Sequence, residues 1–160
     1  MRRLKETFIG LTAESDRQKA GLALEVLLNQ LFTIYGLDPR RPFKIIGEQI
    51  DGSFDLDAQI YLVEAKWEKQ PLPEAPMLIF RGKIEGKSTF TRGLFIALNG
   101  VSQEARHAIT QGKSPSFFVM DGYDLYMILS ETTNLTDFLR KRIRLLAEEG
   151  RVCVPFSEIR

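Results

Sequence analysis

The sequence predicts an α/β fold in which a mixed β-sheet is flanked by helices. Three observations predict it. Apolar residues recur at helical spacing over residues 20–36, short strand-like segments fill Phe43–Trp67, and two uniformly apolar runs of strand length follow at Gly93–Leu98 and Ser116–Met120. A three-strand meander followed by an α-β-α-β order indicates one mixed sheet with helices on both faces.

The composition favours one cytoplasmic domain over residues 1–160. The chain has 22 Lys+Arg against 21 Asp+Glu, one His and one Cys. A single Cys excludes an internal disulfide and a Cys-rich zinc site. No apolar run has the length of a membrane span or of a signal peptide, so we expect no membrane partner. Chemistry, if any, is expected from carboxylates and lysines.

Local sequence signals mark where helices are expected to begin and end. Ser15 and Gln18 fit a capping box before the first helix, and Gly36 is a plausible end. A short helix is expected over Met77–Ile84. Three further helices are expected: one capped by Ser102, one that follows Asp121-Gly122, and one that is capped by Asn134 and ends before Gly150. Residues 152–154 are a candidate edge strand.

The Phe43–Trp67 segment brings acidic residues together. A two-residue turn at Asp57-Ala58 pairs Leu56 with Gln59, and the same register sets Asp51 opposite Glu64. Opposed residues share a face, with Cβ atoms about 5 Å apart. Alternation further predicts that Ile50, Phe54 and Leu56 share the other face, and that Lys66 follows Glu64 on the acidic one.

Opposed carboxylates destabilise a sheet unless a charge compensates them, and a divalent cation is the simple candidate. Mg²⁺ prefers oxygen ligands, including one or two carboxylates, and Mn²⁺ is expected to substitute. Lys66 beside such a metal can orient or deprotonate a water, which is the chemistry of phosphodiester hydrolysis. The competing interpretation is a solvated acidic hairpin, but Val63 and Trp67 around Glu64 indicate a central strand. Glu25, at the margin of the first helix's apolar stripe, is either a further site residue or an ordinary boundary glutamate.

These residues resemble the PD-(D/E)XK nuclease superfamily and, within it, the Mrr-like restriction endonucleases. The resemblance covers most of the chain. It is carried by the leading helix with Glu25, by Asp51-Gly52-Ser53-Phe54-Asp55, by Glu64-Ala65-Lys66, by residues 91–100 with Glu104, and by residues 118–125. It implies a restriction-endonuclease-like core and a Mg²⁺-dependent DNA endonuclease.

The resemblance also implies roles. Asp51 and Glu64 are metal ligands, Lys66 serves the attacking water and Glu25 assists. Asp55 aligns with the family's second turn acid and competes with Asp51 as ligand. The register favours Asp51, although no proline precedes it. Mrr-like enzymes often carry a separate DNA-binding domain, so a homodimer or a separate DNA-recognition domain or subunit is expected.

Local positive charge points to a nucleic-acid-binding segment. Arg81, Lys83, Lys87 and Arg92 outnumber Glu85, a local excess of three positive charges. A solvated helix and loop is the alternative. A second basic cluster at residues 140–144 is interpreted as solvated surface or dimer rim. His107 is expected to be structural, and Cys153 to serve packing.

Two further functions compete with an endonuclease of restriction, defence or repair. One is a catalytically inactive module that binds nucleic acid or protein on the same fold. The other is a structural or assembly domain. The intact set of two acids and a lysine favours the nuclease, because a pure binder has little reason to place two acids where phosphate would lie.

Overall fold

The central element is a mixed four-stranded sheet, as predicted. A computed structural model describes residues 1–45, 47–111 and 114–159, and across these residues the main sheet has the order β3-β4-β5-β6. β3 (Gly52–Leu56) is antiparallel to β4 (Gln59–Lys66). β5 (Arg92–Ala97) lies parallel to β4, and β6 (Phe117–Asp121) lies parallel to β5.

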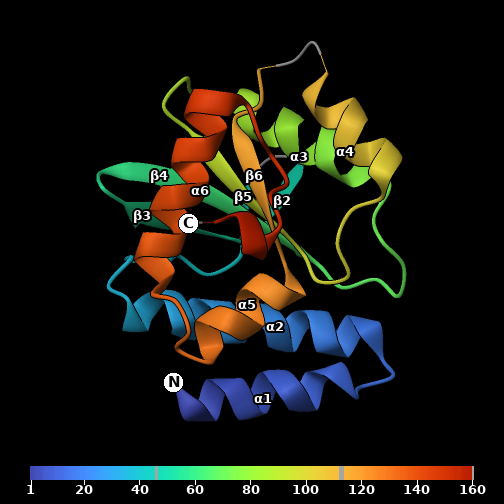
Figure 1. Cartoon of the computed structure of the whole chain (residues 1–160), viewed down its shortest axis with the longest axis vertical. Coiled ribbons are helices and arrows are strands. Elements are labelled where there is room, and N and C mark those ends of the chain that lie inside the picture. The colour runs from blue at the N-terminus through green and yellow to red at the C-terminus, as the bar shows by residue number, and fades with distance from the viewer. Residues whose placement is uncertain (46, 112–113, 160) are drawn as a thin grey trace.

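Helices cover both faces of this sheet (Figure 1). One face carries the chain's early and late helices, and α3 and α4 pack on the other. On the first face are α1 (Arg2–Thr12), α2 (Arg17–Ile34), α5 (Gly122–Leu129) and α6 (Leu135–Glu149). On the second are α3 (Ala75–Glu85) and α4 (Gln103–Thr110), and a 3₁₀ turn, Phe156–Glu158, lies near the C-terminus. No helix among the described residues is both long and apolar enough to cross a membrane.

The strands that follow α3 are buried on both sides. Leu94 and Ile96 of β5 join the cluster beneath α2, α5 and α6, whereas Phe95 and Ala97 join the cluster beneath α3 and α4. Alternating side chains of one strand therefore fill two cores, as expected of a parallel strand covered on both faces. This explains why the run Gly93–Leu98 is apolar without alternation.

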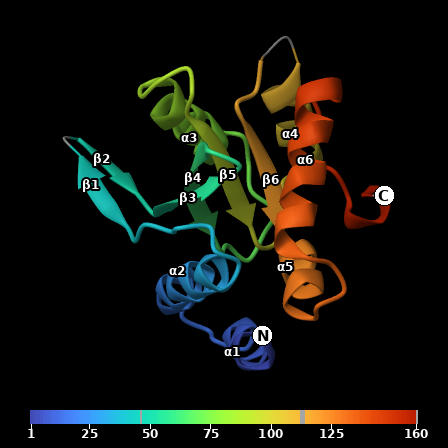
Figure 2. The same ribbon diagram turned by 90° about the vertical axis from the view of Figure 1, so that its left-hand side faces the viewer.

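The expected three-strand meander is instead four strands in two sheets. β1 (Phe43–Ile45) and β2 (Glu48–Ile50) form a separate antiparallel hairpin, which projects beside the main sheet (Figure 2). The chain changes sheet at Asp51. The prediction that Ile50 shares a face with Phe54 is therefore wrong: Ile50 packs in the α3 cluster and Phe54 in the α2 cluster.

The N-terminal helix α1 was not predicted. Leu4 and Phe8, one helical turn apart, are its buried residues, and Phe8 stacks on Trp67 with ring centroids 5.9 Å apart. Its apolar stripe is too short to stand out in the sequence, and packing on α2 supplies the rest of its stability.

Two smaller expectations also differ from the structure. The N-cap of α2 is Asp16, whose carboxylate accepts the Gln18 and Lys19 N–H groups, rather than Ser15. The candidate edge strand at residues 152–154 forms only a parallel bridge between Cys153 and Val119. The caps at Ser102 and Asn134 are confirmed.

Candidate active site

The predicted register of the acidic hairpin is confirmed. Leu56 pairs with Gln59 and Gly52 with Val63, so the ladder ends one residue after Asp51. Beyond that point the Asp51 side chain continues the pairing, because the backbone N–H of Ala65 donates to Asp51 Oδ2 at 3.1 Å. The hydrogen bond fixes the Asp51 carboxylate against the backbone of the residue that follows Glu64.

Glu64 is buried between two lysines. It lies on the α3 face of β4, with only 7% of its side chain exposed. Lys83 Nζ of α3 donates to Glu64 Oε2 at 3.1 Å, and Lys66 Nζ lies 3.7 Å from Glu64 Oε1. Each carboxylate oxygen therefore has its own cation. A buried carboxylate without such partners would be strongly unfavourable.

Glu25 of α2 lies near Asp51, whereas the sequence left open whether it is a site residue or an ordinary boundary glutamate. It lines a depression with Asp51, and Arg40 and Arg41 form part of the lining. Partial burial raises the pKa of the Glu25 carboxyl, and the charge of Asp51 raises that pKa further, while Lys66 opposes both. These electrostatic effects place Glu25, Asp51 and Lys66 in one neighbourhood.

The three carboxylates Asp51, Glu64 and Asp55 are not assembled into one cluster. Asp55 lies opposite Ile60, nearer the hairpin tip. Throughout the described ranges no three His, Cys, Asp or Glu side chains gather closely enough to hold a metal ion together. Mg²⁺ is commonly held by one or two carboxylates and completed by water and phosphate oxygens. Asp51 and Glu64, anchored at adjacent backbone positions of β4, fit that donor set.

The four predicted nucleic-acid-binding residues all have partners within the chain. Arg81 pairs with Glu85 in the same helix, Lys87 pairs with Glu48 of the β1-β2 hairpin, and Arg92 donates to the carbonyls of Thr89 and Thr91.

Lys83 differs most from expectation, because its side chain is only 18% exposed and contacts Glu64. The prediction that it lies on a basic surface is wrong, since α3 turns this residue toward the sheet.

Arg40 and Arg41 were missed by the sequence reasoning. Both are exposed and both line the depression beside Glu25 and Asp51. Backbone bonds between Arg40 and Ser53 hold this segment along β3. The available signal was two adjacent arginines shortly before the acidic hairpin, but only the fold brings them to the carboxylates.

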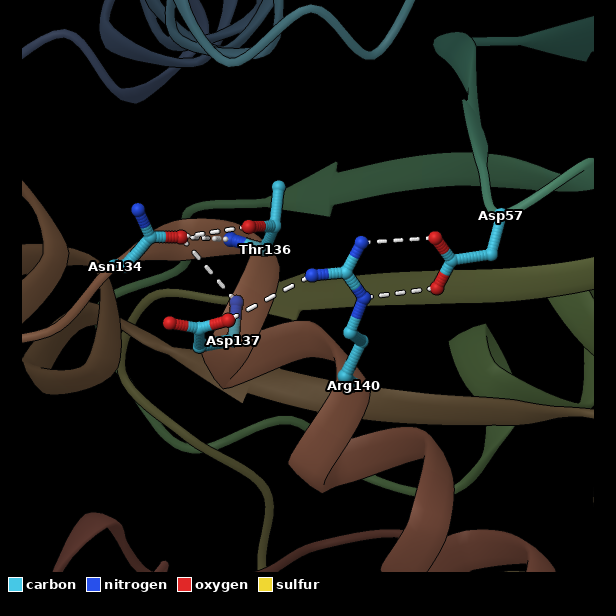
Figure 3. A network of polar contacts seen from close by, with 5 residues as sticks. All are labelled: Asp57, Asn134, Thr136, Asp137 and Arg140. Atoms are coloured by element: carbon cyan, nitrogen blue, oxygen red, sulfur yellow. Dashed lines mark hydrogen bonds and ion pairs between the residues drawn. The ribbon is translucent and has the colours of Figure 1, made fainter.

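The second basic cluster is not simply solvated. Arg140 of α6 makes two hydrogen bonds, of 2.8 and 2.9 Å, to the Asp57 carboxylate at the β3-β4 turn, and also lies 3.6 Å from Asp137 (Figure 3). Arg142 is 1% exposed and donates to Asp124 at 2.7 Å. The surface interpretation is therefore wrong for Arg142, because it lies inside the molecule.

The lone His and Cys do not enter the site. His107 is exposed on α4. Burial raises the pKa of the Cys153 thiol to about 11, against the opposing influence of Arg106 and Arg142. A thiol in that state stays protonated at neutral pH and is a poor nucleophile.

The sequence matches the Mrr_cat family, described as a restriction endonuclease, over residues 17–129. The chain belongs to this restriction endonuclease family. The matched range holds Glu25, Asp51, Glu64, Lys66 and Lys83, and it confirms the resemblance noted from the sequence. A comparison with curated proteins finds no match.

Two of three solved structures similar to this Mrr_cat member share its fold. One, a protein of unknown function called AF1548, has 13% identity and a TM-score of 0.54 and covers 76% of each chain. Another, the small subunit R.BspD6I2 of the heterodimeric restriction endonuclease R.BspD6I, has 14% identity and a TM-score of 0.52, and covers 98% of this chain and 84% of that one. The MspJI restriction endonuclease, solved with a 27-mer oligonucleotide, has 14% identity and a TM-score of 0.48, and covers 95% of this chain and 36% of that one.

Proposed function

We propose that this chain is a Mg²⁺-dependent endonuclease that hydrolyses DNA phosphodiester bonds, with a role in restriction, defence or repair. The observation that carries the proposal is the pairing at β4: Asp51 bound to the Ala65 N–H, and Glu64 and Lys66 on either side of that residue. Family membership supports it, because in the sequence resemblance Asp51 belongs to the family's acidic turn and Glu64 and Lys66 to its Glu-x-Lys element.

Each side chain has a proposed role. Asp51 and Glu64 would hold the metal, and a bound Mg²⁺ supplies Lewis-acid polarisation of a phosphate oxygen and an acidified water. Lys66, with 43% of its side chain exposed, can reach solvent and orient or deprotonate the attacking water through Nζ. Glu25 lies near both Asp51 and Lys66 and assists in orienting that water.

DNA would approach across the depression. Arg40 and Arg41 lie beside the carboxylates, and Lys44 is exposed on the β1-β2 hairpin. Lys87 ties that hairpin to the segment after α3 by its ion pair with Glu48. Phosphate contacts of this kind supply affinity that depends on salt and position the backbone over the carboxylates.

Calorimetry with Mn²⁺ tests the metal site directly. Wild-type protein is expected to bind Mn²⁺, and Asp51→Ala to lose measurable binding, because one of two carboxylate ligands is removed. The matched control is Asp137→Ala, which removes an exposed carboxylate from α6. Equal binding by wild type and Asp51→Ala would remove the metal site from the proposal.

Cleavage of DNA tests the reaction. Lys66→Ala is expected to lower the Mg²⁺-dependent cleavage rate by about a hundredfold or more, the contribution typical of proton transfer by a positioned side chain. Its circular dichroism spectrum should match that of wild type, because Lys66 lies at the solvent-facing end of β4. Equal rates for wild type, Asp51→Ala and Lys66→Ala would contradict the nuclease assignment.

One observation favours a non-cleaving module as second candidate. Both oxygens of Glu64 already face lysines, so the charge of this carboxylate is compensated without a metal. This candidate predicts salt-sensitive DNA binding with no Mg²⁺-dependent turnover. We further propose that the chain acts as a homodimer or beside a DNA-recognition domain or subunit. Light scattering on the isolated chain checks the first of these.

A further inference from the structure

We propose that Lys83 is a positioning residue that occupies Glu64 before the metal binds and sets the metal affinity of the site by competing for Glu64 Oε2. The inference rests on the proposed function, because it takes Glu64 to be a metal ligand. Nothing in the sequence singled out this lysine from its basic neighbours. Only the tertiary structure distinguishes Lys83 from them.

Lys83 is enclosed and directed at one oxygen. Its Nζ lies 3.1 Å from Glu64 Oε2, and the two side chains are 18% and 7% exposed. Lys66 differs on each point: it is 43% exposed and lies 3.7 Å away from the other oxygen, Oε1. The two lysines therefore serve Glu64 differently, with Lys66 open to solvent and Lys83 held inside.

The helix that carries Lys83 has little room to move. Phe80 and Ile84 of α3 lie against Gly93 of β5 so closely that a Cβ on this glycine would come within 2.7 Å of the Phe80 ring and 2.4 Å of Ile84 Cδ1. Phe80 also packs edge-on against Phe95 and Phe117. Release of Glu64 by Lys83 must therefore come from rotation of the lysine side chain, because the helix backbone is fixed by the core.

Lys83 and a metal ion would compete for Glu64 because both are cations. A buried carboxylate needs a cation, and Lys83 provides it when no metal is bound. A divalent cation on Glu64 Oε2 would lie beside the ammonium that now occupies that oxygen, and the two like charges would repel strongly in a partly buried setting. Metal binding at Glu64 Oε2 would therefore require Lys83 to rotate away from that oxygen.

Calorimetry with Mn²⁺ on Lys83→Met tests this. The variant is expected to bind Mn²⁺ about tenfold more tightly than wild type, because the competing charge-assisted hydrogen bond is gone. Lys83→Arg keeps the charge and should restore an affinity close to that of wild type. The matched control is Lys141→Met, which removes an exposed lysine from α6 and should leave the affinity unchanged.

A thermal melt gives a second readout. Without metal, Lys83→Met should melt below wild type, because Glu64 keeps only Lys66; with saturating Mn²⁺ its gain in Tm should exceed the gain of wild type. Lys83→Gln, which keeps a hydrogen-bond donor, serves if the Met variant does not fold.

Unchanged or weaker Mn²⁺ binding by Lys83→Met, or by Lys83→Gln in its place, with binding by wild type and none by Asp51→Ala, would overturn this inference and leave the proposed function standing. No Mn²⁺ binding by wild type would overturn both.

Discussion

At the residue scale, the least expected feature is the buried ion pair between Arg142 and Asp124. Burial raises the pKa of Asp124 to about 6, and Arg142 only partly opposes this; burial likewise lowers the pKa of Arg142. Both directions indicate that desolvation outweighs the attraction within the pair. Asp124 Oδ1 and two of the Arg142 guanidinium nitrogens have no hydrogen-bond partner among the described residues. The pair ties α5 to α6 at a cost in free energy.

Arg142→Met is expected to lower the free energy of unfolding by about 3 kcal/mol, because Asp124 is then left buried without its cation. In an Asp124→Asn background the same change should cost clearly less, since no unpaired carboxylate remains. Urea unfolding of the four proteins measures the coupling. Additive effects of the two substitutions would contradict a direct energetic link between these residues.

At the element scale, the β3-β4 hairpin shows how a turn sets the site. Asp57 and Ala58 both have positive φ, 53° and 61°, which gives the strand twist that a two-residue hairpin needs. Arg140 of α6 holds the turn through the Asp57 carboxylate, and it lowers the pKa of that carboxyl (Figure 3). The register that follows from this turn brings Asp51 to Ala65.

Ala58→Gly is expected to raise the free energy of unfolding by about 1 kcal/mol, because an L-residue with a Cβ is strained in the left-handed region and glycine is not. Thermal and urea unfolding would show it. Ala23→Gly, a half-buried position inside α2, is the matched control and should destabilise by about 1 kcal/mol. A loss of stability in Ala58→Gly would contradict the left-handed conformation of this turn.

At the scale of the whole molecule, the nearly neutral net charge of +1 does not show how the charged side chains are distributed between the core, ion pairs and the exposed surface. One arginine lies inside the core, several basic residues are paired with acids of the same chain, and Arg40 and Arg41 remain exposed beside the carboxylates. Total charge is therefore a poor guide to where DNA would bind.

Arg41→Ala is expected to weaken DNA binding and to reduce the slope of log affinity against log salt by about 1, the loss of one phosphate contact. Fluorescence anisotropy with a labelled duplex in Ca²⁺, at several salt concentrations, measures it. Arg144→Ala on α6, an exposed arginine paired with Glu148, should leave the slope unchanged. Equal slopes for wild type and Arg41→Ala would place DNA elsewhere on the molecule.

Local signals were sufficient for most elements and for the hairpin of the site. Turn chemistry at Asp57-Ala58 and the two-residue period of strands predicted the register from Leu56-Gln59 to Gly52-Val63, and caps at Ser102 and Asn134 marked two helices. These features depend on residues close together in the sequence, so the sequence alone determined them. The family resemblance added the fold of the core.

Contacts between distant segments were decided only by the tertiary structure. The division of Phe43–Trp67 into two sheets, the burial of Arg142, the approach of Arg40 and Arg41 to the acids, and the pairing of Lys83 with Glu64 all join parts of the chain that local patterns do not relate. A charged side chain looks the same in the sequence whether it faces water or a buried partner. Its role follows from the desolvation and charges around it, and these exist only once the helices have packed on the sheet.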